Sequence, residues 1–181
     1  MKIQEIELFQ VDIPPIPAIA KYMPKIFDLT LCRVITDEGL IGLGEAHGFP
    51  PDFEEAKQRL IGSDPLSIDP FTEEDPFECA LLDIAGQAAG LPLHRFFGKQ
   101  VRDRVPVSYW SRPMEPEETA AEAEVGARLG FTNHKLKARP WNVVETVRLM
   151  KEAVGSDYSV GLDPNQKFGE VHVAARLAHK L

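Results

Sequence analysis

Cysteine is scarce in this sequence, and long apolar runs are missing. The two cysteines, Cys32 and Cys79, are too few for a disulfide framework and lack the spacing of a metal site. No run approaches the roughly 20 apolar residues of a membrane-spanning helix, and the first residues lack the apolar core of a signal peptide. We therefore expect a cytoplasmic protein with reduced thiols and no membrane partner.

Positive charge is also in short supply. The chain has 20 lysines and arginines against 28 acidic residues, which gives a net charge of −8. A protein without a basic patch is a poor ligand for nucleic acid or for an anionic membrane surface. The apolar content of 44% is ordinary for a soluble globular protein, and 181 residues suffice for one large or two small domains.

The first third of the chain has the alternation of a β-sheet. Residues 2–13, Leu29–Thr36 and Leu40–Glu45 are predicted strands, and Pro14 ends the first of them. Gly39 supplies the positive φ that a tight turn between the second and third strands requires. The pattern predicts a three-stranded antiparallel sheet.

Helical patterns follow this sheet. Asp52 and Glu55 have the spacing of a capping box, which predicts a short helix ending before Gly62. An apolar stripe at helical spacing predicts a second helix over Phe77–Ala89, and Gly90 is placed to end it. A sheet followed by helices is typical of an α+β domain.

From about Val105 the chain alternates strands with helices. Three strands are expected, over Val105–Trp110, Thr132–Ala138 and Tyr158–Leu162, each followed by a helix. The expected helices are Glu117–Leu129, a segment opened by a capping box of Asn142 and Glu145 and ending at Val154, and Glu170–Leu181. Repeated strand–helix units imply a parallel sheet, whose strands present reactive groups at their carboxyl ends.

Two lysines and two oxygen-bearing residues occur at such strand ends. Lys135 and Lys137 should share one face of their strand, and Asp163 and Asn165 one face of the next, because side chains alternate along a strand. Burial and a second ammonium nearby both favour the neutral amine that can accept a proton. A carboxylate is a ligand that Mg²⁺ prefers. Two alternatives stay open, a solvent-facing lysine pair and a simple turn at Asp163-Pro164-Asn165.

Four motifs in order carry a family resemblance over essentially the whole chain. They are the hairpin Asp37–Glu45 (DEGLIGLGE), the helix Ala80–Gly86 (ALLDIAG), Lys135-Leu136-Lys137, and Gly161–Gln166 (GLDPNQ). The sequence resembles the enolase superfamily, in the branch of mandelate racemase and muconate lactonizing enzyme. This resemblance implies an α/β fold with an N-terminal α+β capping domain over residues 1–104. Residues 105–181 would then be the first three βα units of a TIM-like (β/α)7β barrel, truncated in this chain.

The resemblance also implies residue roles. Lys137 would be the general base, Lys135 its catalytic neighbour, Asp163 a Mg²⁺ ligand, and Asn165 a residue near the bound acid. A Lys or His base with Mg²⁺ is the enolase-type means of stabilising an enediolate.

Three further residues are candidates for substrate binding. Lys21 and Tyr22 lie in a segment that corresponds to a loop closing over the substrate in the family. Trp110, at the end of the first parallel strand, could line the pocket or only pack.

The function implied is Mg²⁺-dependent abstraction of the proton α to a carboxylate, by a lyase or isomerase acting on a small-molecule carboxylate. Dehydration of a sugar acid is the first expectation, with racemisation, epimerisation and cycloisomerisation as alternatives. The family's further acidic ligands are missing from the three barrel strands present. We therefore expect these residues to belong to a longer, homo-oligomeric protein or a truncated copy, and the 181 residues alone to be inactive.

Two hypotheses of other classes compete with this one. A lysine beside another cation is also a good amine nucleophile, so a Schiff-base lysine in an aldolase-like barrel is an alternative chemistry. A non-enzymatic remnant that serves in assembly is the second alternative.

Overall fold

A computed structural model describes residues 1–15, 20–21 and 27–181 of the chain. The chain forms two compact units, Met1–Asp103 and Arg104–Leu181, and each is described by itself. The assignment of residues 1–104 to a capping domain and of 105–181 to a barrel domain stays a prediction.

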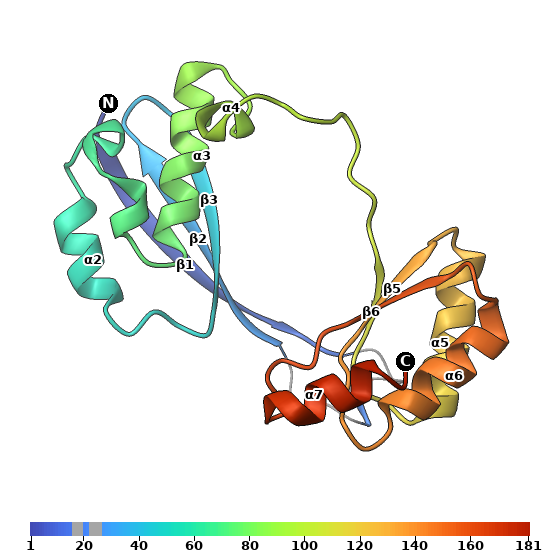
Figure 1. The fold of residues 1–181 in the computed structure, drawn as a ribbon. Coiled ribbons are helices and arrows are strands. Elements are labelled where there is room, and N and C mark those ends of the chain that lie inside the picture. The colour runs from blue at the N-terminus through green and yellow to red at the C-terminus, as the bar shows by residue number, and fades with distance from the viewer. Residues whose placement is uncertain (16–19, 22–26) are drawn as a thin grey trace. The chain divides into compact units, whose positions relative to one another are not determined.

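The first unit is built on an antiparallel sheet, as the sequence predicts. Its strands are β1 (Ile3–Ile13), β2 (Phe27–Thr36) and β3 (Ile41–His47), in the order β1-β2-β3 (Figure 1). Gly39 has the predicted positive φ, +85°, in the turn between β2 and β3. Its N–H donates to the carbonyl of Thr36 at 3.0 Å, which closes the turn.

Short helices follow the sheet in this unit. They are α2 (Phe53–Leu60), the 3₁₀ turns η1 (Pro65–Ser67) and η2 (Pro70–Thr72), α3 (Phe77–Ala89) and α4 (His94–Phe97). Helix α3 lies directly on β3, and glycine makes this approach possible: a Cβ on Gly44 would lie 1.9 Å from the carbonyl oxygen of Pro76. Asp83 of α3 also accepts a hydrogen bond from the backbone N–H of Leu43 at 2.9 Å.

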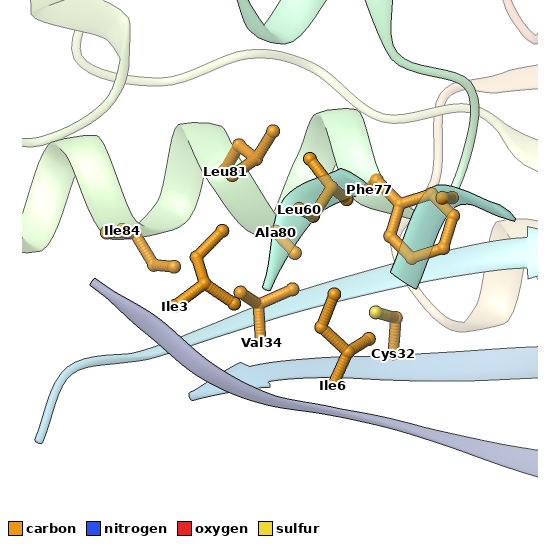
Figure 2. Packing of buried hydrophobic residues seen from close by; sticks show 10 residues of the cluster. Ile3, Ile6, Cys32, Val34, Leu60, Phe77, Ala80, Leu81 and Ile84 are labelled. Atoms are coloured by element: carbon orange, nitrogen blue, oxygen red, sulfur yellow. The ribbon is translucent and has the colours of Figure 1, made fainter. Parts of the chain in front are cut away.

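One apolar cluster fills the space between the sheet and its helices (Figure 2). Ile6, Cys32 and Val34 point from the strands toward Phe77 and Ile84 of α3. The buried members are Ile3, Ile6, Cys32, Val34, Ala56, Leu60, Phe77, Ala80, Leu81 and Ile84. Because the sheet buries only one face, this cluster is the hydrophobic core of the unit.

The second unit is built on a parallel sheet, again as predicted. Its strands are β4 (Tyr109–Ser111), β5 (Asn133–Leu136) and β6 (Ser159–Leu162), in the order β4-β5-β6. Its helices are α5 (Pro116–Arg128), α6 (Val143–Val154) and α7 (Val171–Ala178). Ala123, Leu136, Met150 and Tyr158 form one buried cluster, and Ala138, Val143 and Leu177 form another. In the part of the chain that the structure describes, no helix has the length and apolar character needed to cross a membrane.

The predicted strand Val105–Trp110 is wrong in its first four residues. Pairing begins only at Tyr109, which lies opposite His134. Val105 and Val107 are 69% and 70% exposed, so their apolar side chains have no sheet to pack on.

Both predicted capping boxes are wrong in their hydrogen bonds, although the helices begin where they were expected. Asp52 and Asn142 make no side-chain bond to the helices they precede. Their backbones have ψ of 21° and −3°, outside the extended region that an N-cap side chain needs to reach the first turn. Glu145 instead pairs with Arg148 at 2.7 Å.

Candidate functional site

Lys135 and Lys137 lie at the carboxyl end of the middle strand of the parallel sheet. Lys135 is in β5, and Lys137 follows its last residue. The backbone continues beside its neighbours for two more residues: the Lys137 N–H donates to the carbonyl of Ser111 at 3.4 Å, and the Ala138 N–H to that of Asp163 at 3.2 Å. The lysines are therefore attached to a sheet rather than to a free loop.

Both amines converge on one carboxylate. Nζ of Lys137 lies 2.6 Å from Oδ2 of Asp163, and Nζ of Lys135 lies 3.1 Å from the same oxygen. Nζ of Lys137 also donates to Oδ1 of Asn165 at 2.5 Å. The structure thus brings together the four residues that the sequence analysis placed at the strand ends.

The backbone that carries Asp163 and Asn165 differs from the prediction. The two residues follow β6 in a turn, so their predicted alternation along a strand is wrong. Asn165 has a φ of +45°, and its N–H donates to Oδ1 of Asp163 at 3.1 Å, while the Lys167 N–H bonds the carbonyl of Pro164. Asp, Pro and Asn favour such turns, and the turn rather than the pleat aims both side chains at Lys137.

The lysines set the charge state of Asp163. Ion pairing and hydrogen bonding, first with Lys137 and then with Lys135, lower the pKa of Asp163 to about 2. The side chains of Lys137 and Asp163 are 22% and 27% exposed, and that of Lys135 is 51% exposed. Asp163 is therefore ionised at neutral pH, and its side chain is partly accessible to solvent.

The opposite face of the sheet carries a buried histidine. Nε2 of His134 lies 2.7 Å from Oγ of Ser111, and both side chains are buried. Burial lowers the pKa of His134 to about 4, so the ring is neutral at neutral pH. Sequence analysis did not single out Ser111, because the strand it predicted ended at Trp110 and the partner of Ser111 lies 23 residues away in the sequence.

The remaining candidates lie in both units. Trp110 pairs in register with Lys135, is 39% exposed, and has the guanidinium of Arg112 5.0 Å from its ring centroid. Lys21 belongs to the first unit. Tyr22 lies outside the described residues.

The oxygen atoms at the strand ends are of the type that binds Mg²⁺, but they are too few to fill its coordination sphere. Asp163 and Asn165 offer hard carboxylate and amide oxygens, the ligand type that Mg²⁺ prefers. No group of three or more His, Cys, Asp or Glu side chains that could hold a metal occurs among the described residues. Asp163 and Asn165 alone, among the residues that the structure describes at these strand ends, would leave a Mg²⁺ ion short of oxygen ligands.

Curated proteins with similar sequences include racemases, dehydratases and epimerases. An N-succinyl-L-Arg/Lys racemase from Bacillus cereus is 27% identical over 92% of this chain and 53% of its own length. A cis-3-hydroxy-L-proline dehydratase from Roseibium aggregatum is 30% identical over 76% of this chain and 45% of its own length. No family model matches the chain.

Solved structures with a similar fold are also epimerases and enolase superfamily proteins. A dipeptide epimerase from Cytophaga hutchinsonii, complexed with Mg and the dipeptide D-Ala-L-Val, superposes with a TM-score of 0.81 at 25% identity. The match covers 100% of this chain and 56% of that protein. A member of the enolase superfamily from Roseovarius nubinhibens, complexed with magnesium, has the same fold, with a TM-score of 0.76 over 99% of this chain and 56% of its own.

The chain belongs to the enolase superfamily. It spans about half the length of the curated relatives it matches and represents their N-terminal portion. The superfamily assignment confirms the resemblance drawn from the four sequence motifs.

Proposed function

We propose that the protein containing these residues abstracts the proton α to a carboxylate, with Lys137 as the base. The observation that carries the proposal is the convergence of Lys137, Lys135 and Asn165 on Asp163 at the strand ends. Racemases, epimerases and dehydratases among the relatives all fit a reaction that begins by breaking such a C–H bond.

The geometry gives each side chain a distinct task. Lys137 has its Nζ held by two oxygens, and this fixes the position of the atom that must approach the substrate carbon. The amine must leave this ion pair to reach a substrate carbon. Lys135, 3.1 Å from the same carboxylate, places a second amine beside it.

Asp163 is the residue of this chain that would ligate Mg²⁺, together with a neutral contribution from Asn165. When bound, the ion supplies positive charge that stabilises an enediolate. We propose that its other acidic ligands lie outside these 181 residues, because the described residues offer no cluster of carboxylates.

Two outcomes of proton abstraction are supported. Dehydration of a sugar acid was the expectation from the sequence, and D-galactonate dehydratases are among the relatives, at 27% identity for the one from Pectobacterium atrosepticum. Racemisation or epimerisation of an acylated amino acid or dipeptide is favoured by the racemase match over 92% of the chain and by the epimerase structures. For this reason we propose racemisation or epimerisation ahead of dehydration.

Proton exchange tests the proposal whichever product the enzyme forms. The full-length protein is incubated in D₂O with Mg²⁺ and a panel of N-succinyl amino acids, dipeptides and sugar acids, and α-deuteration is followed by NMR. We expect deuteration of at least one class, lost on addition of EDTA. Absence of exchange across acids of all three classes would contradict the proposal.

The Schiff-base alternative is tested on the same protein. Borohydride treatment in the presence of a carbonyl substrate reduces an imine and leaves a stable mass increase on the lysine. We expect no such adduct at Lys135 or Lys137. Lys167, an exposed lysine in the turn after β6, serves as the matched control for nonspecific modification.

A further inference from the structure

The backbone ladder beside the lysines is short. Only three residue pairs join β4 to β5, and the last backbone contact, from the Lys137 N–H to the Ser111 carbonyl, is 3.4 Å long. On its other side β5 is held by four residue pairs with β6 and by the bond from the Ala138 N–H to the Asp163 carbonyl at 3.2 Å. Backbone bonds therefore constrain this strand end less on the β4 side, where a side-chain contact can add to its position.

Ser111 contacts the residue before Lys135 and the second residue after it. Its carbonyl accepts the N–H of Lys137, and its Oγ lies 2.7 Å from Nε2 of His134. Because side chains alternate along a strand, the Ser111–His134 bond lies on the face opposite the lysine amines. Ser111 therefore contacts the lysine strand both before and after Lys135.

The histidine ring is held from both neighbouring strands. The Tyr109 ring, on β4, has its centroid 5.3 Å from that of His134, and the Tyr158 ring, just before β6, lies at 6.3 Å, both edge-on. Glu122 of α5 is the charged group on this side, and it accepts a hydrogen bond from the Tyr109 hydroxyl at 2.7 Å. A neutral imidazole and a serine hydroxyl can each donate or accept, so the bond exists in either tautomer.

We infer that Ser111 and His134 are positioning residues, which hold the strand end bearing Lys135 and Lys137 in place from the buried side of the sheet. Neither residue touches the amines or their oxygen partners. The inference rests on the proposed function only for the role given to the lysines, and its test requires no turnover.

Three variants of the full-length protein separate positioning from stability. Ser111→Ala and His134→Phe each remove one partner of the hydrogen bond. The double variant removes both partners, so neither polar side chain is left buried without the other. The readouts are the ¹⁵Nζ resonance of Lys137, the hydrogen exchange of the Lys137 amide, and the melting temperature. Ser108→Ala is the matched control, because it removes the exposed bond from Ser108 to Asn133 between the same two strand segments.

We expect both single variants to shift the Nζ resonance and to speed Lys137 amide exchange about tenfold, with Ser108→Ala unchanged. The double variant should recover most of the melting temperature, since removing both partners of a buried bond is nearly neutral. Its Nζ resonance and amide exchange should stay altered.

Two results would overturn the inference. One is an unchanged Nζ resonance in all three variants. The other is recovery of the resonance and of amide exchange together with stability in the double variant, which would leave the bond a purely structural role. Failure of the proposed function is a separate result, namely α-proton exchange that does not depend on Lys137.

Discussion

The two units hold their charged side chains in different ways. In the first unit Glu73, whose side chain is 4% exposed, meets Arg59 alone through two hydrogen bonds, the second at 2.8 Å. In the second unit the more exposed Asp163 meets Lys135 and Lys137 at once. In this one-to-one pair the charge of the buried Glu73 carboxylate is balanced by the guanidinium of Arg59, whose side chain is 54% exposed. A carboxylate facing two amines leaves excess positive charge at a surface, and this is the arrangement that can receive an anionic substrate.

The two units also differ in how much apolar surface their cores bury. The first unit has strands of 7 to 11 residues over one cluster of ten buried residues. The second has strands of three or four residues and two small buried clusters. We infer that apolar burial dominates the stability of the first unit, whereas the second depends more on individual polar contacts near its site.

The largest expected effect on stability is in the first unit. Ile84→Ala should lower the free energy of unfolding by about 2–5 kcal/mol, because Ile84 is fully buried and its loss leaves a cavity. The matched control is Leu43→Ala, on the exposed face of the sheet that α3 covers, at 59% exposure, with an expected loss below about 1 kcal/mol. Chemical denaturation measures both, and equal losses would contradict the dominance of apolar burial in the first unit.

Acid should weaken the second unit through His134. Its pKa is about 4 in the folded chain against an ordinary 6.5, so between these values the unfolded state binds more protons. Stability is therefore complete above about pH 6.5 and falls as the pH drops toward 4, by a total on the order of 3 kcal/mol. His134→Phe should flatten this part of the pH profile of denaturation midpoints. An unchanged slope in that variant would show that His134 is not the titrating group.

Lys135→Ala should have a moderate effect, on activity rather than on fold. The full-length variant should retain partial α-proton exchange, about tenfold below the wild type, because only the neighbouring charge is removed. Exchange rates measured by NMR from pH 6 to 10 check this, and total loss of exchange would assign Lys135 a direct catalytic role.

The smallest effect is expected at an exposed pair on α6. Glu145, whose pKa the adjoining Arg148 lowers, has a half-exposed side chain 2.7 Å from that guanidinium. Exposed pairs at this spacing contribute little, so Glu145→Gln should leave the denaturation midpoint essentially unchanged. Denaturation at low and high salt is the check, and a clear, salt-dependent fall of the midpoint in the variant would show that surface pairs matter in the second unit.

Apolar periodicity predicted most of the fold from the sequence. The three antiparallel strands and helix Phe77–Ala89 were found because their apolar residues repeat at the spacing of each element. The strand expected from Val105 failed because pairing depends on a neighbour: Asn133 begins the partner strand, so the register leaves residues 105–107 with no residue of β5 opposite them.

The sequence predicted which four residues lie together at the strand ends, but not the backbone conformation that brings them there. Lys135 and Lys137 share a face as alternation requires, and both reach Asp163. The turn at Asn165 and the bond between Ser111 and His134 could not be predicted from local pattern, since each depends on contacts between segments distant in the sequence. Tertiary contacts of this kind leave no periodic signal.

The most direct test of the central claim is the α-proton exchange of the full-length protein with Lys137→Ala, measured in D₂O on the best substrate of the panel. We predict a loss of at least about 100-fold with an unchanged denaturation midpoint, because a general base contributes roughly 10²–10⁴-fold. Lys167→Ala should exchange like the wild type. Wild-type exchange by the Lys137→Ala variant would contradict the account.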